Sequence, residues 1–497
     1  MMAGRRPPSS MDPETDYDRV DYPGHAYPQT HPDRLAAIAR LFGFEAADPA
    51  GCRVLELGCG DGANLLALAE AYPDSRYVGF DLAATAVTRG QRAVAATGLA
   101  NLDLRVGNLA ALPSDLGEFD FVVAHGVYSW VPEPVREALL AACRRHLAPR
   151  GIAFVSYNVL PGGHLRRLLR ESMLMHLEGV DEPAARTAAA REFLGWVRDS
   201  LGGDAEHAAS ALAREVERVS RRTDAGLFHD DLSAEFHLPY FRDFCEAAAR
   251  HDLQFLAETE FAAMQDPPLA PAARAKLDAW APGLLEREQY RDFLVERRFR
   301  QSLLCRAGIA LGHEVSAASL EGLAMSSSLS ETPDAAASGP RAYRTHDGLP
   351  FVTDDANVQA AIATLAQAWP RALPVASLTA RARRDSGEAA ASRVADFALS
   401  ALGAGLAQVH ARQPDFAAAA PERPVASALA RWQASAGTQV TGRLGNTVLL
   451  DDALARRVLA LLDGTRDRDA LRRETGVDAD RLERCLAGLA RCALLRP

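Results

Sequence analysis

The sequence predicts an α/β protein that opens with a parallel, doubly wound sheet. Short apolar runs alternate with amphipathic helical patterns up to residue 157, and a glycine-rich turn follows the first run. The pattern then becomes mainly helical, and the chain ends in short helices around one apolar run at 447–450. With 497 residues and 48% hydrophobic content, we expect about three domains.

The first domain is expected to span residues 22–163. A helical pattern at 35–42 begins near Thr30 or His31 and precedes the first strand. Strands are predicted at 53–57, 77–80, 102–106, 119–124 and 152–157, and helices at 62–71, 84–97 and 134–146.

The remaining regions differ in composition. Residues 1–21 are polar and rich in Pro and Asp, which predicts a disordered N-terminus without a signal peptide. Residues 164–313 carry long amphipathic runs and few convincing strands, which predicts a helical domain. Residues 314–345 are crowded with Ser, Ala, Gly and Pro and are expected to form a linker before a C-terminal domain at 346–497.

The charge and cysteine patterns exclude several classes of protein. The net charge is -10, and Arg alternates with Asp and Glu instead of forming basic blocks, so we expect no nucleic-acid partner. The seven cysteines contain no CxxC pair, which predicts reduced thiols, no metal and a cytoplasmic protein. No apolar stretch approaches the length of a membrane span, and a homodimer is compatible with the sequence.

The strongest functional signal is the glycine turn at 54–62, VLELGCGDG, where a buried strand runs into a loop that opens a helix. Glycines suit this place because a side chain would block a cofactor from the backbone and from the helix N-terminus. Gly58, Gly60 and Ala63 also satisfy the dinucleotide-binding spacing. Asp81, at the end of the next strand, suits a ribose in either case.

Glu56 favours one of these two cofactor classes. An acid two residues before the first glycine would repel a pyrophosphate and suits the positively charged end of S-adenosylmethionine (SAM). SAM therefore fits the turn better than a nicotinamide dinucleotide. A purely structural turn in an unrelated α/β protein remains the alternative.

The segment resembles motif I of the class I SAM-dependent methyltransferases. By position, the resemblance implies that the turn meets the amino-acid part of SAM, that the acid of the second strand holds the ribose, and that residues after the third strand meet the adenine. The implied cofactor contacts are Glu56, Gly58, Cys59, Gly60, Asp81, Leu82, Asn108 and Leu109. Asn108 departs from the common aspartate, although its amide oxygen can still face the adenine amino group.

A second group of candidates follows the fourth predicted strand. His125, Tyr128 and Trp130 lie at its carboxyl end, where open α/β sheets bind their ligands. Ordinary packing under a loop is the alternative for Tyr128 and Trp130. The Asn- or Asp-Pro-Pro-aromatic pattern of many amide and nucleobase N-methyltransferases is absent from this stretch.

Further segments resemble a narrower family, which joins a class I methyltransferase to a helical methyltransferase regulatory domain and includes the rickettsial-type protein lysine methyltransferases. The resemblance covers roughly residues 20–310. It implies a seven-stranded Rossmann-like sheet and a small C-terminal winged-helix-like α+β module. Its segments are Thr30, His31 and Pro32, then 156–158, 161–162, 228–232, 239–241, 288–290, 292–293, Arg297 and 299–300.

This resemblance implies transfer of a methyl group from SAM to a lysine amine of a protein by in-line displacement. We expect His125, Tyr128 or Tyr22 to accept or orient the amine proton. Trp130, Tyr157 and Asn158 are the candidate substrate contacts. A small molecule or peptide natural product as acceptor, and a SAM-binding regulatory scaffold without turnover, are the alternative functions.

Two hypotheses concern residues outside the main motifs. Tyr22, Tyr27 and His31 are expected to contact SAM as a lid, or else to pack the helix before the first strand. His229, Asp230 and Asp231 could suggest a metal, but further ligands at useful spacing are missing, so a structural role such as helix capping is favoured.

Overall fold

The computed structural model describes residues 15–202, 210–312, 314–332 and 340–497. A seven-stranded sheet with the order β3-β2-β1-β4-β5-β7-β6 forms its centre, which confirms the predicted Rossmann-like sheet. The neighbouring pairs from β3 to β5 are parallel, whereas β7 runs antiparallel to both β5 and β6. The strands are β1 (Arg53–Leu57), β2 (Arg76–Asp81), β3 (Leu102–Val106), β4 (Phe119–Ala124), β5 (Leu147–Asn158), β6 (Leu253–Glu258) and β7 (Phe299–Arg306).

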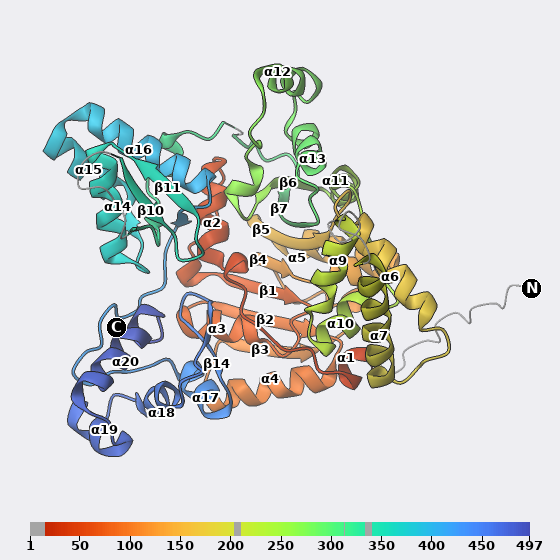
Figure 1. Cartoon of the computed structure of the whole chain (residues 1–497), viewed down its shortest axis with the longest axis horizontal. Coiled ribbons are helices and arrows are strands. Elements are labelled where there is room, and N and C mark those ends of the chain that lie inside the picture. The colour runs from red at the N-terminus through yellow and green to blue at the C-terminus, as the bar shows by residue number, and fades with distance from the viewer. Residues whose placement is uncertain (1–14, 203–209, 313, 333–339) are drawn as a thin grey trace, which may run out of the picture.

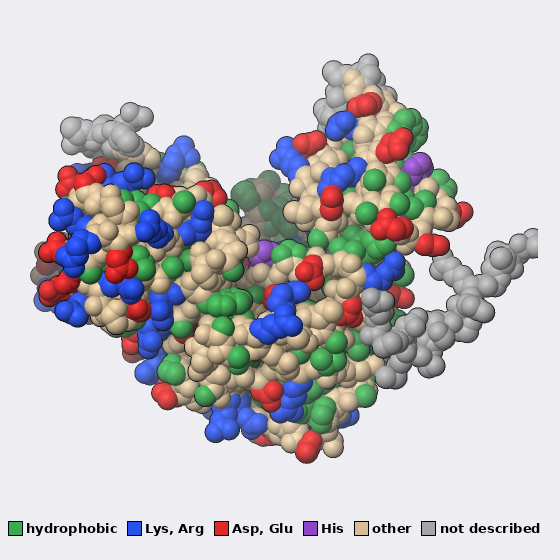
Figure 2. Space-filling model, turned by 90° about the horizontal axis from the view of Figure 1, so that it is seen from below, with side chains coloured by type: hydrophobic (Ala, Val, Ile, Leu, Met, Phe, Trp, Pro, Cys, Tyr) green, Lys and Arg blue, Asp and Glu red, His purple; other side chains and the backbone are tan. Residues whose placement is uncertain are grey.

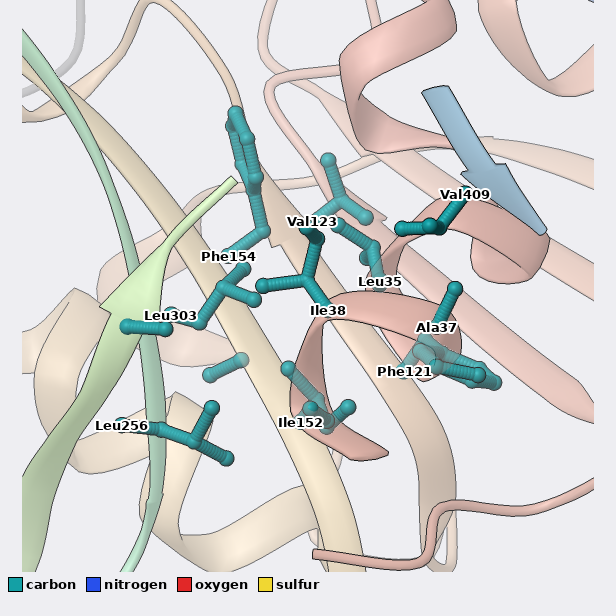
Figure 3. Close-up of a cluster of buried hydrophobic side chains, with 14 of the residues drawn as sticks. Leu35, Ala37, Ile38, Phe121, Val123, Ile152, Phe154, Leu256, Leu303 and Val409 are labelled. Carbon is teal, nitrogen blue, oxygen red and sulfur yellow. The ribbon is translucent and has the colours of Figure 1, made fainter. Parts of the chain in front are cut away.

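Helices connect and cover these strands as the alternation predicts. The helices nearest the sheet are α2 (Pro32–Leu41), α3 (Ala63–Ala71), α4 (Ala84–Thr97), α5 (Glu133–His146) and α11 (Phe241–Arg250). Helix α2 belongs to the core, since Leu35 and Ile38 are buried against Val123 and Phe154 of the sheet (Figure 3). On its other side α2 meets Val409 of the strand Gln408–His410, so the helix joins the sheet to the C-terminal half of the chain.

Residues 164–313 are not purely helical, and this expectation was wrong. Helices α6 (His164–His176), α7 (Pro183–Leu201), α9 (Ala211–Ser220) and α10 (Asp224–Asp231) form a helical domain with its own small core. Helices α12 (Pro271–Trp280) and α13 (Leu284–Leu294) lie near the top of Figure 1. Strands β6 and β7 lie in the same stretch but complete the central sheet. The charge of Arg300 suggests an exposed position, which argues against a buried strand at β7. In the structure Arg300 is fully buried, and buried acids pair with its charge.

The predicted linker at 314–345 is also corrected. Its described residues form a short helix, Ala317–Leu320, and the strands β8 (Ala324–Ser326), β9 (Ser330–Glu331) and β10 (Arg341–Arg344). Small polar residues suggested a linker, yet Leu320, Met325 and Leu329 are fully buried in the main core. Residues 333–339 of that prediction lie outside the described residues.

The region 346–497 forms two units instead of one domain. The first shares the main core and contains β11 (Pro350–Thr353), β12 (Leu373–Pro374), β13 (Gln408–His410), α14 (Ala356–Ala368), α15 (Val375–Ser386) and α16 (Glu388–Gly403). The second has a separate core and contains α17 (Ala428–Ala436), α18 (Ala453–Leu461), α19 (Arg468–Thr475), α20 (Ala479–Arg491) and the hairpin of β14 (Gln439–Thr441) with β15 (Thr447–Leu449). The hairpin confirms the predicted winged-helix character.

The C-terminal units lie on the left of Figure 1 and the helical domain on the right, with the sheet between them. Seen from below, the surface is hollowed between these two sides, and acidic and basic side chains are interspersed over it (Figure 2). His410 joins the first unit to α2, because its Nδ1 lies 2.6 Å from Asp33 Oδ2. None of the described helices is long and apolar enough to cross a membrane.

Candidate functional site

A cavity of about 930 Å³ lies at the carboxyl ends of β1, β2 and β4, the edge at which open α/β sheets bind ligands. Its volume is at the upper end of the range of small-molecule sites. The sheet, the segment before α2 and the helical domain all contribute walls. Of the residues singled out in the sequence, it is lined by Tyr22, Tyr27, Glu56, Gly58, Cys59, Gly60, Asp81, Leu82, Asn108, Leu109, His125, Trp130 and Asn158.

The glycine turn has the conformation that its sequence requires. Gly58, Gly60 and Gly62 have φ values of 79°, 56° and 72°, in the left-handed region that favours glycine. A Cβ on Gly58 would lie 2.4 Å from Val127 Cγ2, whereas a Cβ on Gly60 would meet no protein atom within 4 Å. The turn is therefore packed on one side, and its backbone at Gly60 faces the open cavity.

Glu56 lines this cavity and has one carboxyl oxygen without a partner among the described residues. The side chain is 3% exposed, Oε1 accepts a 3.0 Å hydrogen bond from Asn64 Nδ2, and Oε2 has no partner among the described residues. Burial raises the pKa of Glu56 to about 8, against the lowering effect of Asn64. A buried acceptor without a donor is costly, so this oxygen fits the ammonium group at the amino-acid end of SAM.

Asp81 lines the cavity and also fixes the glycine turn through hydrogen bonds to backbone amides. Its Oδ2 accepts the Gly60 amide at 2.7 Å and its Oδ1 accepts the Ala83 amide at 2.9 Å. Burial raises the pKa of this carboxyl above its usual value. Each oxygen keeps a lone pair that fits a ribose hydroxyl. The Asn108 oxygen already accepts the Ala110 amide at 2.9 Å, so facing an adenine amino group would be its second hydrogen bond.

His125 lies in the wall between the sheet and Tyr27, whose ring centroid is 4.1 Å away. Its Nδ1 lies 2.9 Å from Ser156 Oγ, and burial lowers the pKa of the imidazole to about 4. His125 is therefore neutral near pH 7 and a weak proton acceptor. Its position suits orientation of a ligand better than removal of a proton.

Tyr128, Tyr157 and His31 do not line the cavity, and these assignments are corrected. Tyr128 lies in a short helix that turns it inward, where its ring packs edge-on against Phe244 at 5.2 Å. Tyr157 points to the opposite side of β5 from Asn158, and its hydroxyl lies 3.1 Å from Ser302 Oγ. His31 caps α2, since its Nδ1 accepts the Asp33 amide.

Residues 15–27 form a strap across the cavity. The expectation of disorder was wrong for residues 15–21, whose helix α1 (Asp16–Arg19) has a capping box, while residues 1–14 lie outside the described residues. The strap is tied to α4, where Asp18 Oδ1 accepts the Thr85 hydroxyl at 2.6 Å. It is also tied to α10, where His229 Nε2 lies 2.7 Å from the Val20 carbonyl oxygen and its ring stacks on Tyr17. The lid hypothesis thus applies to the strap, whereas α2 is a core helix.

The helical domain supplies the wall that faces the glycine turn, and sequence reasoning missed most of it. The lining residues from this side include Arg166, Arg222, Asp230, Glu235 and Phe236, and β7 adds Phe299. Phe236 stacks on Trp130 at 5.1 Å, and the Arg166 guanidinium lies over both rings. No spacing pattern connects such distant residues, so only the fold reveals that they share the cavity.

Two neighbouring acids of α10 have different surroundings: Asp231 forms buried ion pairs, whereas Asp230 lines the cavity. Asp231 is fully buried and forms ion pairs with Arg166 at 2.8 Å and Arg222 at 2.9 Å. These residues lie at the C-terminal end of α10, so the expected helix capping is corrected to ion pairing. Asp230, in contrast, lines the cavity.

Three family models match the chain. Residues 54–151 match a methyltransferase domain, residues 223–306 match the predicted methyltransferase regulatory domain, and residues 422–483 match the C-terminal winged-helix domain of PKMT. The first match contains the glycine turn and His125. The second contains Asp230 and Phe236, so the cavity lies between the two matched domains.

Relatives and solved structures agree with these matches. The chain is 35% identical over 299 residues to the uncharacterized protein RP789 of Rickettsia prowazekii, a match that spans 60% of this chain and 54% of RP789. It is 33% identical over 240 residues to RP028 of the same organism, which spans 48% of this chain and 96% of RP028. Thus the chain spans about half the length of RP789 and nearly all of RP028.

The structure of PKMT2 from Rickettsia typhi is similar along the whole chain. It has a TM-score of 0.86 and 26% identity, and the match covers 96% of this chain and 100% of PKMT2. PKMT2 in complex with AdoHcy matches with a TM-score of 0.85. The cofactor of this protein is SAM, and the orphaned Glu56 oxygen and the Asp81 carboxylate fit it. The chain therefore belongs to the class I SAM-dependent methyltransferases, in the PKMT-like family that adds a methyltransferase regulatory domain and a winged-helix domain.

Proposed function

We propose that the protein transfers a methyl group from SAM to a lysine amine of a protein substrate. The observation that carries this proposal is the shared cavity, which continues from the glycine turn onto the helical domain. Its far wall includes the rings of Trp130, Phe236 and Phe299 together with the carboxylate of Asp230. Aromatic rings and carboxylates are the groups that recognise an alkyl amine.

Different residues of the cavity would bind the cofactor and align the acceptor. Glu56 and Asp81 hold the amino-acid and ribose ends of the cofactor, and Asn108 with Leu109 borders the adenine. SAM, when bound, supplies an electrophilic methyl group on a sulfonium. The protein then has to align the amine lone pair with the S–CH3 bond and to exclude water, and the strap and Trp130 at the cavity wall would serve the second task.

Two of the candidate proton acceptors are poor bases. Burial raises the pKa of Tyr22 to about 12, so its phenol stays protonated near pH 7. His125, with its pKa of about 4, is equally unsuited. We therefore assign His125 and Tyr22 to orienting the acceptor, together with Trp130 and Asn158 at the cavity wall.

The test is incubation of the protein with tritiated SAM and a heat-denatured bacterial lysate, followed by acid hydrolysis and amino-acid analysis. Label in methylated lysine supports the proposal. Label only in small metabolites would favour the small-molecule alternative, and cofactor binding without transfer would favour a regulatory scaffold. Because Lys276 is the only lysine in this chain, label on the protein itself at lysine can be assigned to one exposed position.

The remaining expectations about cellular context stay predictions. We propose a cytoplasmic enzyme acting on a protein or peptide, without a nucleic-acid or membrane partner. A homodimer remains compatible with the chain. The seven cysteines are free thiols, in keeping with a reducing compartment.

A further inference from the structure

Asp230 is held in the cavity wall by one of its two carboxylate oxygens. Oδ2 forms an ion pair with Arg222, and the backbone carbonyl oxygen of Asp230 accepts a 2.7 Å hydrogen bond from Arg166. Among the described residues, Oδ1 has no hydrogen-bond partner. Because 23% of the side chain is exposed and the residue lines the cavity, this oxygen is available to a ligand.

Asp230 lines the same cavity as Glu56 and Asp81, and the phenols of the strap lie near all three acids. The pKa of the Tyr27 phenol is raised chiefly by burial, and then by Tyr22, Glu56 and Asp230. The pKa of Tyr17 is raised by its partial burial, and then by Asp230, Tyr22 and Asp81. Two strap phenols thus lie within electrostatic reach both of Asp230 and of Glu56 or Asp81.

Asp230 lies among charged and polar groups of both signs. Arg222 forms ion pairs with Asp230 and Asp231, and Arg166 forms one with Asp231. The phenols of Tyr17 and Tyr22 and the neutral ring of His229 also lie nearby, and Arg218, Glu235 and Arg298 line the same cavity. Burial raises the pKa of Asp230 above its usual value, although both arginines lower it. A carboxylate with increased proton affinity in a cavity is a candidate proton acceptor.

We propose that Asp230 of the helical domain binds the acceptor amine and takes its proton before methyl transfer. An N–H proton of the ammonium moves to Oδ1, which leaves a neutral amine and a carboxylic acid. The nitrogen lone pair then forms the N–CH3 bond while the S–CH3 bond breaks and its electrons stay on sulfur. The product is a methylated ammonium and neutral S-adenosylhomocysteine (SAH), and the proton on Asp230 returns to water.

This inference rests on the proposed function, and it assigns the domain opposite the glycine turn a direct part in the chemistry. Its first test needs no substrate. We would measure by calorimetry the affinity of two SAH analogues whose sulfur is replaced by a nitrogen. One analogue carries a short alkyl chain ending in an amine on that nitrogen, and the other carries the same chain ending in a methyl group.

Wild-type protein should prefer the amine analogue by about 10- to 100-fold, because a charge-assisted hydrogen bond is formed. Asp230→Asn should abolish this preference and leave SAH affinity unchanged. Asp224→Asn is the matched control, since Asp224 lies at the other end of α10 in an exposed ion pair with Arg191. Where Asp230→Asn does not fold, Asp230→Ser removes the same carboxylate. An unchanged amine preference in a folded Asp230 variant overturns the proposal.

The second test is the pH profile of kcat/KM with a lysine peptide identified from the labelled lysate. Asp230→Asn should lose most of its rate near pH 7 and regain it as the pH approaches about 10, where free lysine loses its proton. A merely structural role would lower the rate equally at all pH values, and that result overturns the proposal. If wild type transfers no methyl group to any amine, the proposed function fails, whereas the analogue experiment still decides whether Asp230 binds an amine.

Discussion

The Asn64 amide nitrogen lies 3.0 Å from Glu56 Oε1 and 3.0 Å from Thr30 Oγ1. The oxygen of the same amide accepts the Tyr27 backbone amide at 3.0 Å. Asn64 therefore links the Glu56 side chain to the end of the strap at Tyr27. It is a positioning residue, since it acts through Glu56 and Tyr27.

Asn64→Ala should weaken SAH binding about tenfold, because it removes a hydrogen bond to a carboxylate and releases the strap. Calorimetric titration measures the effect. Asn101→Ala is the control, because Asn101 donates to the carbonyl groups of Ala69, Tyr72 and Ser75. That variant should lose thermal stability and keep its SAH affinity. Equal loss of affinity in both variants would contradict the positioning role.

The raised pKa of Glu56 makes the stability of the unliganded protein depend on pH. Folding raises this pKa from 4.5 to about 8, so between these values the folded state binds more protons than the unfolded state. The contribution of Glu56 to stability therefore falls as the pH rises from about 4.5 to about 8. Glu56→Gln should remove this slope, measured as the difference in Tm between variant and wild type across that range. A difference that does not change with pH would contradict the prediction.

Arg300 should be essential to the sheet. It is fully buried and forms ion pairs with Glu258, Glu288 and Asp292, which join β6, β7 and α13. Arg300→Ala would leave these acids without their shared cation and should cost about 3–5 kcal/mol of unfolding free energy.

Urea denaturation measures the loss for Arg300→Ala. The control is Arg341→Ala, which removes an exposed ion pair with Glu331 and should cost less than about 1 kcal/mol. Similar losses in the two variants would show that the buried cluster is not the stabilising feature.

Gly24 anchors the strap against Asp61. A Cβ on Gly24 would lie 2.0 Å from Asp61 Oδ1, so Gly24→Ala should displace the strap or the Asp61 side chain. We expect faster dissociation of SAH, by roughly threefold to tenfold. Stopped-flow displacement measures it, with Gly51→Ala as control because a Cβ there would meet no protein atom within 4 Å. Unchanged dissociation from the Gly24 variant would argue against a covering role.

The glycine turn and its acids were predictable because they are local in sequence. The turn needs glycine conformations at Gly58 and Gly60, and Asp81 ends the neighbouring strand, so spacing alone brings them together. The inward turn of Tyr128 was not predictable, because a single turn of helix decides which of its residues faces the core.

The rest of the site depends on contacts between distant segments. Asp230 and Phe236 reach the cavity only because β6 and β7 return to the sheet and place the helical domain above it. Strand β7 was hard to predict because the charge of Arg300 indicates an exposed position until its buried acidic partners are known. Likewise, the small polar residues around Leu320 and Met325 are typical of a linker, although both side chains are fully buried.

Calorimetric titration with SAH at pH 7, repeated in buffers of different ionisation enthalpy, is the most direct test of the cofactor site. We predict binding at one site with release of a proton from Glu56, and loss of that release in Glu56→Gln. No heat of binding with SAH, together with tight binding of a nicotinamide dinucleotide, would contradict the assignment of this cavity as a SAM site.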